Sequence, residues 1–63
     1  MQDILERERP YVTVDRAAEL LDVHPRTIRR AIERGEVRAR YFGRCLRVET
    51  RTLFGEVFGR EVA

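Results

Sequence analysis

Residues 13–35 read TVDRAAELLDVHPRTIRRAIERG, and this stretch decides the fold that the sequence predicts. Thr13 is a residue type that often caps the N-terminus of a helix, and Asp15 follows in the first turn, where the helix dipole favours an acidic side chain. The next apolar residues recur at i, i+3, i+4 and i+7, as they do on one face of a helix. They are Val14, Ala17, Ala18 and Leu21. The spacing predicts a first helix that ends before a three-residue turn at residues 22–24.

A second helix is predicted to begin at Pro25, because the first position of a helix does not need the N–H that proline lacks. His24 then occupies the N-cap position, and a turn residue is a better interpretation of it than a phosphate contact. Gly35 supplies the left-handed residue that ends many helices. The buried stripe of this helix is Ile28, Ala31 and Ile32.

Two short helices joined by such a turn form a helix-turn-helix unit, whose second helix presents its outward N-terminal residues to base edges in the DNA major groove. At about 100° per residue, Arg26, Arg30 and Glu33 point away from the buried stripe, whereas Thr27, Arg29 and Arg34 lie on its flanks. The candidate base-contacting residues are therefore Arg26, Thr27, Arg29 and Arg30.

A β-hairpin is predicted after this unit, with Val37 anchoring the chain in the core. Residues 38–41 and 45–48 have the composition of short strands, and the glycine in Phe-Gly-Arg (42–44) permits the positive φ that a tight turn needs. We expect Arg40, Arg44 and Arg47 to make this hairpin a basic wing beside the second helix. The alternative is an ordinary hairpin whose arginines extend into water.

The two ends of the chain are predicted separately. Residues 1–9 form a polar N-terminal segment, the domain spans residues 10–63, and residues 11–12 are a brief extended lead-in. Thr50 is expected to cap a last helix that carries the apolar stripe Leu53, Phe54, Val57 and Phe58 and ends at Gly59. The predicted fold class is mainly α with a small β-hairpin, arranged as a winged helix-turn-helix with a C-terminal helix.

Charge is distributed unevenly along the chain. Residues 1–22 carry six acidic and three basic side chains, whereas residues 26–47 carry eight arginines and two glutamates. A basic block of this kind is typical of a surface that binds a polyanion. The alternative is a solvated helix face with internal ion pairs, such as Arg29 with Glu33 one turn further on.

Residue types that carry catalysis or bind metals are scarce. Cys45 and His24 are the only cysteine and the only histidine, so the sequence provides neither a metal-ligand set nor an internal disulfide. Cys45 is expected in a buried or half-buried strand position, not as a nucleophile. We therefore predict that the protein is not an enzyme and has no cofactor. Neither a signal peptide nor a membrane span is evident, which favours a cytoplasmic location.

The runs VTVDRAAELLDVHPRTIRRAIERGEV (12–37) and ARYFGRCLRV (39–48), followed by Leu53, resemble the excisionase and MerR-like DNA-binding domains over about residues 11–54. Two departures fall in the turn and concern its geometry: Asp22 stands where the family often has glycine, and His24 where it often has serine. The resemblance implies that the second helix enters the major groove and that the wing contacts the backbone or the minor groove. By position, the major-groove residues are Arg26, Thr27, Arg29 and Arg30, and the wing contacts are Arg44, Arg47 and Arg40.

Within this family the chain is most similar to phage excisionases, also called recombination directionality factors. That resemblance implies a non-catalytic protein whose copies bind adjacent DNA sites cooperatively, bend the DNA and direct an integrase toward excision. The chain ends at Ala63 without a heptad segment, which argues against a ligand-sensing MerR-type dimer. The expected partners are double-stranded DNA with attachment-site or operator repeats, neighbouring copies of the protein and an integrase, with no membrane and no small-molecule substrate. Two alternatives remain: a small MerR-like transcriptional regulator that binds direct repeats at promoters, and a protein-interaction module that grips an acidic partner.

Overall fold

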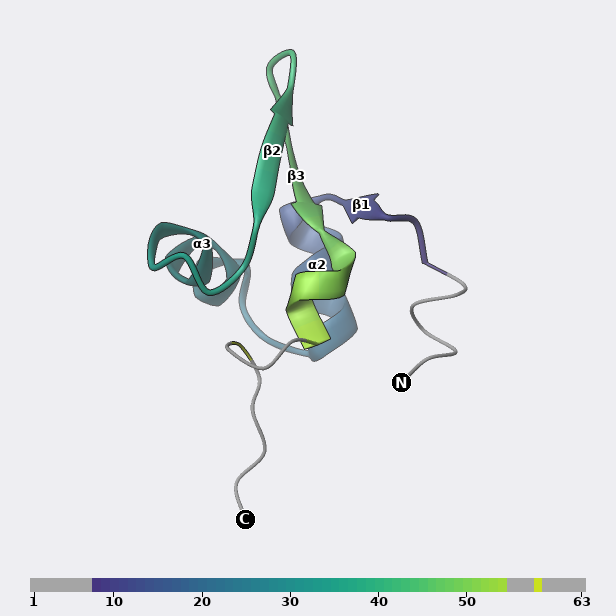
Figure 1. The fold of residues 1–63 in the computed structure, drawn as a ribbon. Helices are drawn as coiled ribbons and strands as arrows, with labels where there is room; N and C mark the ends of the chain where they lie inside the picture. The colour runs from purple at the N-terminus through teal and green to yellow at the C-terminus, as the bar shows by residue number, and fades with distance from the viewer. Residues whose placement is uncertain (1–7, 55–57, 59–63) are drawn as a thin grey trace.

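The computed structural model describes residues 8–54 and 58 of the chain. Two helices, α2 (Val14–Leu21) and α3 (Pro25–Glu33), precede a hairpin of β2 (Ala39–Phe42) and β3 (Cys45–Glu49). A short strand, β1 (Tyr11–Val12), comes before the helices, and a 3-10 helix, η1 (Thr50–Phe54), follows the hairpin. Figure 1 shows α3 on one side of the hairpin, β1 on the other, and the tip of the hairpin extending beyond both helices.

Helix α2 begins and ends at residues that satisfy its free backbone groups. The Thr13 hydroxyl accepts a hydrogen bond from the Arg16 N–H at 3.0 Å, as an N-cap residue does. At the other end Asp22 adopts the left-handed conformation with φ 54°. Asp22 N–H then donates to Glu19 C=O at 3.2 Å and Val23 N–H to Ala18 C=O at 2.9 Å, which is the Schellman pattern of helix ends.

Helix α3 begins at Pro25 and is capped by His24, as the sequence predicts. The His24 side chain accepts a hydrogen bond from the Arg26 N–H at its Nδ1 atom, so it replaces the hydroxyl or carboxylate that usually caps a helix. Gly35 ends the helix with φ 77°. The predicted turn at residues 22–24 between α2 and α3 is therefore confirmed.

The sheet has three strands in the order β1-β3-β2, where the sequence predicted only a two-stranded hairpin. β1 pairs antiparallel with β3, and places Tyr11 opposite Glu49 and Val12 opposite Val48. Residues 11–12 are therefore more than an extended lead-in. Two β-branched side chains meet at the Val12–Val48 pair, and both are buried in the core.

The predicted C-terminal helix does not begin as expected. Residues 50–54 form a 3-10 helix, and Thr50 is not its cap: the buried Thr50 hydroxyl donates to the Arg9 C=O at 2.6 Å. The Thr50 N–H donates to Pro10 C=O at 2.9 Å, so this residue extends the contact between the strand ends. Phe58 packs against the core, and the rest of the predicted helix, with Gly55, Val57 and Gly59, lies outside the described residues.

The core lies between the two helices and one face of the sheet. Ile28 of α3 and Val48 of β3 are fully buried, and Leu53 of η1 is 1% exposed. Val37 is also buried, which confirms its predicted role as the anchor between α3 and the hairpin. The remaining buried hydrophobic residues are Val12, Val14, Ala17, Ala18 and Ala31. The alanines let α2 and α3 approach closely, and this contact sets the orientation of α3.

Candidate nucleic-acid interface

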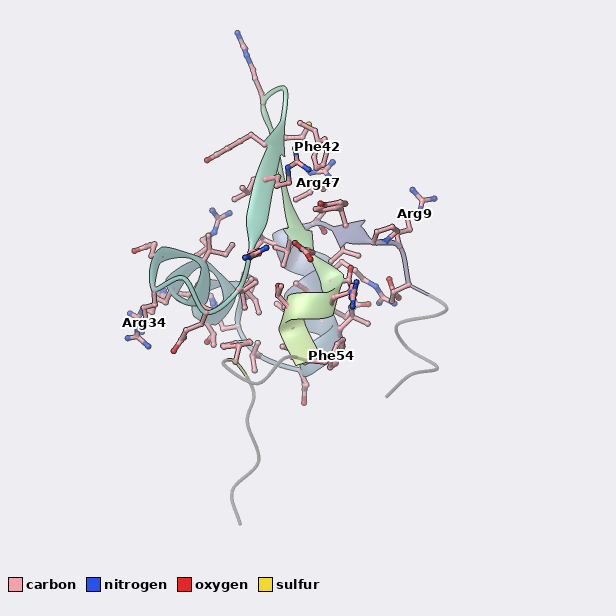
Figure 2. The ribbon with its side chains drawn as sticks, viewed as in Figure 1. Arg9, Arg34, Phe42, Arg47 and Phe54 are labelled. Carbon is pink, nitrogen blue, oxygen red and sulfur yellow. The ribbon has the colours of Figure 1, made fainter. Side chains whose placement is uncertain are left out.

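The outer face of α3 carries the four residues that the sequence singled out. Ile28 and Ala31 are 0% and 2% exposed, and their burial fixes which side of the helix faces solvent. The side chains on the opposite side and its flanks are exposed: Arg26, Thr27, Arg29 and Arg30. Arg34 is also exposed, and Figure 2 shows it extending from the C-terminal end of α3 away from the rest of the molecule.

The arginines of α3 have no acidic partner among the described residues. The ion pairs formed by residues 8–54 and 58 both involve Arg16, whose guanidinium contacts Glu8 and Glu19. Arg29 and Glu33 do not form the ion pair that would have made this an ordinary solvated face. A cluster of exposed arginines without carboxylate partners is a strong local source of positive potential, suited to phosphate and base-edge acceptors.

The hairpin turns tightly at Gly43 and Arg44, because Phe42 pairs directly with Cys45. Gly43 has φ 66° and Arg44 does not have a positive φ, as expected for a two-residue turn with glycine in the first position. The turn therefore places the exposed Arg44 at the very tip. This is the most projecting part of the described structure (Figure 1).

Arg40 and Arg47 lie opposite each other in the β2–β3 pair and share one face of the sheet. Arg40 places its guanidinium 5.6 Å from the centre of the Phe42 ring, and Phe42 in turn contacts Tyr11 edge to face, with 5.1 Å between ring centres. Arg47 is half-buried and donates from Nη1 to the Leu46 C=O at 3.0 Å. Figure 2 shows Phe42 and Arg47 on the side of the hairpin away from α3.

The other face of the hairpin looks toward α3, because side chains alternate along a strand. Ala39, Tyr41 and Leu46 lie on this face and line a groove together with residues of α3. Sequence reasoning did not select Tyr41, although the side chain is 71% exposed. The alternation of side chains along the strands could have identified it. Val48 lies in the core, and Leu46, two residues away, shares its sheet face. Tyr41 pairs with Leu46 and therefore lies on the same side, toward α3.

The remaining polar candidates have structural roles or none. Cys45 is exposed, contrary to the predicted buried or half-buried position, because it shares the outward sheet face with Arg47. His24 caps α3. Among residues 8–54 and 58 no group of three potential metal ligands comes together, and no helix there is long and apolar enough to cross a membrane.

One acidic side chain has a pKa displaced by a contact. The hydrogen bond from Arg16 lowers the pKa of Glu8 below its ordinary value, and the positive charges of Arg16 and Arg9 act in the same direction. Glu8 therefore holds the chain that precedes β1 against α2. Its negative charge is matched by Arg16, whereas no described carboxylate pairs with the arginines of α3 or of the hairpin tip.

Two helices joined by a three-residue turn, with the second helix exposed and basic, define a helix-turn-helix unit. The helix-turn-helix domain family matches residues 11–54, which is more than half of the chain, and the protein belongs to this family. No curated protein and no solved structure matches the chain. A helix-turn-helix domain implies DNA binding, and domains of this class are typically not enzymes.

Proposed function

We propose that the protein binds double-stranded DNA sequence-specifically, with α3 in the major groove and the β2–β3 hairpin acting as a wing. The observation that supports this proposal most strongly is the set of exposed arginines on α3, none of which forms an ion pair with a described carboxylate. Arg26, Thr27, Arg29 and Arg30 are proposed to read base edges, because arginine forms two parallel hydrogen bonds with guanine. The wing residues Arg40, Arg44 and Arg47 are proposed to contact the phosphate backbone.

We further propose that this DNA binding serves recombination, with the protein acting as an excisionase in the bacterial cytoplasm. Support comes from the resemblance over residues 11–54 and from the small size of the contact surface. About five phosphate contacts predict roughly a 500-fold loss of affinity between 50 and 200 mM salt. Neighbouring copies on adjacent sites, or an integrase, raise occupancy because each further binding event becomes local. An excisionase uses such an assembly to bend attachment-site DNA and favour excision.

The test is a titration of the full chain against duplex DNA from its own genomic neighbourhood, including any attachment site, and against random duplex DNA. Arg26→Ala is compared with Arg9→Ala, which also removes one arginine charge, but on the side of the molecule away from α3 (Figure 2). We expect cooperative, salt-sensitive binding to the attachment-site DNA that Arg26→Ala loses and Arg9→Ala retains. Absence of binding at low salt would contradict the whole proposal.

The recombination role needs a second assay. Adding the protein to the cognate integrase is expected to raise the yield of excised product and lower that of integration, and Arg26→Ala is expected to abolish both effects. If the protein instead binds promoter repeats and leaves recombination unchanged, it is a MerR-like transcriptional regulator that uses the same surface. If both Arg26→Ala and Arg30→Ala leave DNA binding unchanged, the arginines of α3 serve a protein partner.

A further inference from the structure

A groove of about 300 Å³ separates α3 from the hairpin. One wall belongs to α3, the proposed recognition helix, and the other to the face of the hairpin that looks toward α3. The lining residues are Arg29, Ile32 and Glu33 of α3 and Ala39, Tyr41 and Leu46 of the hairpin. The half-buried lining residues are the apolar Ile32, Ala39 and Leu46, and the exposed ones are Arg29, Glu33 and Tyr41.

Tyr41 is the most exposed large hydrophobic residue of the described chain, at 71% compared with 47% for Phe42. Its exposure follows from the length of the hairpin. Val48, on the same sheet face, is fully buried, and Leu46, two residues nearer the tip, is half-buried. Tyr41 pairs with Leu46, so both lie nearer the hairpin tip than Val48 does. An aromatic ring placed there contributes little to the core and is available to a partner.

The chemistry of the groove fits a strand of DNA backbone. Ala39, Leu46 and Ile32 offer apolar contact for deoxyribose. Arg29 supplies a charged donor on one wall, and the Tyr41 hydroxyl supplies a neutral donor on the other. Glu33 is the one carboxylate that lines the groove. It belongs to α3, the helix proposed to lie against the bases, where a carboxylate can accept a hydrogen bond from cytosine N4.

We propose that one phosphodiester strand of the bound duplex runs through this groove and that the Tyr41 hydroxyl donates a hydrogen bond to one of its phosphates. The inference rests on the proposed function, because a duplex that receives α3 in its major groove and the hairpin on its flank must pass a backbone strand between them. Tyr41 therefore fixes the register of α3 on the DNA through a contact that carries no charge. Arg29, one of the proposed base-contacting residues, also lines the groove, so its charge faces this strand from the opposite wall.

The absence of charge on Tyr41 provides a sharp test. Removing an arginine that contacts a phosphate reduces the slope of log affinity against log salt by about 1, whereas removing a neutral donor leaves the slope unchanged. Tyr41→Phe, which loses only the hydroxyl, is expected to weaken binding roughly fivefold to tenfold with the wild-type slope. Arg29→Ala is expected to weaken binding and to flatten the slope. Tyr11→Phe, which loses the hydroxyl of the other tyrosine, in β1 on the far side of the hairpin from α3 (Figure 1), is the matched control and is expected to bind as the wild type does.

A second measurement locates the contact on the DNA. Single methylphosphonate linkages, which lack the phosphate charge, are introduced one at a time along the recognised duplex. At one linkage beside the major groove we expect the wild type to lose more affinity than Tyr41→Phe does, because the variant has no hydroxyl contact there to lose. Circular dichroism and thermal unfolding are expected to be unchanged for Tyr41→Phe, because the side chain is exposed in the free protein.

The outcomes separate this inference from the proposed function. If the wild type binds DNA but Tyr41→Phe and Tyr41→Ala bind it equally well, the phosphate contact is wrong and the proposed function stands. If these variants keep single-site affinity but lose cooperativity or association with an integrase, Tyr41 faces a protein and the inference is equally overturned. If the wild type binds no DNA, the proposed function itself fails.

Discussion

Asp22 and Gly35 end the two helices of the helix-turn-helix unit in the same way. Both adopt positive φ, 54° and 77°, and the residue after each donates its N–H to a carbonyl five residues earlier: Val23 to Ala18 and Glu36 to Ala31, each at 2.9 Å. Aspartate is one of the few L-residues that tolerate this region. The family that the sequence resembles often has glycine at the position of Asp22. The structure shows that Asp22 adopts the left-handed conformation that glycine would adopt there.

The first prediction concerns Gly35. Nothing lies within 4 Å of a Cβ built on this residue, so a substitution meets only backbone strain. Gly35→Ala is expected to lower the free energy of unfolding by about 1 kcal/mol, because L-residues are disfavoured in the left-handed region. Chemical denaturation measures the change. Asp22→Gly is the matched control and is expected not to lower stability; a loss equal to that of Gly35→Ala would show that backbone conformation is not the cause.

The second prediction concerns the cap of the recognition helix. Nδ1 of His24 accepts the Arg26 N–H at 3.0 Å, and His24→Ala leaves that donor to water. We expect a loss of about 1 kcal/mol in the free energy of unfolding and, because Arg26 follows the cap directly, weaker DNA binding. His24→Ser supplies another acceptor and is expected to restore both stability and binding. Equal stability of the alanine and serine variants would mean that the bond does not stabilise the helix.

The third prediction is a pH dependence. Arg16 lowers the pKa of Glu8, so the folded protein binds this proton less readily than the unfolded chain does. The contribution of the pair to stability is therefore present above the ordinary carboxylate pKa and is lost as the pH falls through the lowered value in the folded state. Unfolding measured from neutral to acidic pH is expected to show wild type more stable than Glu8→Gln at neutral pH, with the difference vanishing in acid. A difference that persists at the acidic end would assign the effect to packing.

Sequence periodicity was sufficient for the helices and insufficient for the rest of the fold. The apolar spacings of α2 and α3 span whole helical turns, and Pro25 and Gly35 mark boundaries by backbone chemistry, so these elements were predicted closely. β1 has two residues, too few to show an alternating pattern, and it becomes a strand only through pairing with β3. Thr50 has the right residue type for a helix cap, but its hydroxyl serves the Arg9 carbonyl, a contact 41 residues away in the chain.

The candidate site shows the same division. Burial of Ile28 and Ala31 was readable from the sequence, and it fixes the exposure of the α3 arginines. The faces of the hairpin were not assigned, because a shift of one residue in register exchanges the two sides of a strand. The register places Arg40 and Arg47 on the face away from α3 and Tyr41 on the face toward it. The sequence grouped three arginines into one basic wing, but they lie in two different environments. Arg44 is at the tip, whereas Arg40 and Arg47 are on the outward face.

The fourth prediction follows from that difference. Arg44 is at the exposed tip, where both flanks of the hairpin meet solvent, whereas the Arg40 guanidinium lies over the Phe42 ring on the face away from α3. A duplex that contacts α3 reaches the tip before it reaches the outward face. Arg44→Ala is therefore expected to weaken binding to attachment-site and random DNA alike and to reduce the salt slope by about 1, while Arg40→Ala has the smaller effect on both. Titrations over a range of salt concentrations compare the two variants directly. A larger effect of Arg40→Ala would mean that the outward face of the hairpin, which carries Arg40 and Arg47, makes more of the phosphate contact than the tip does.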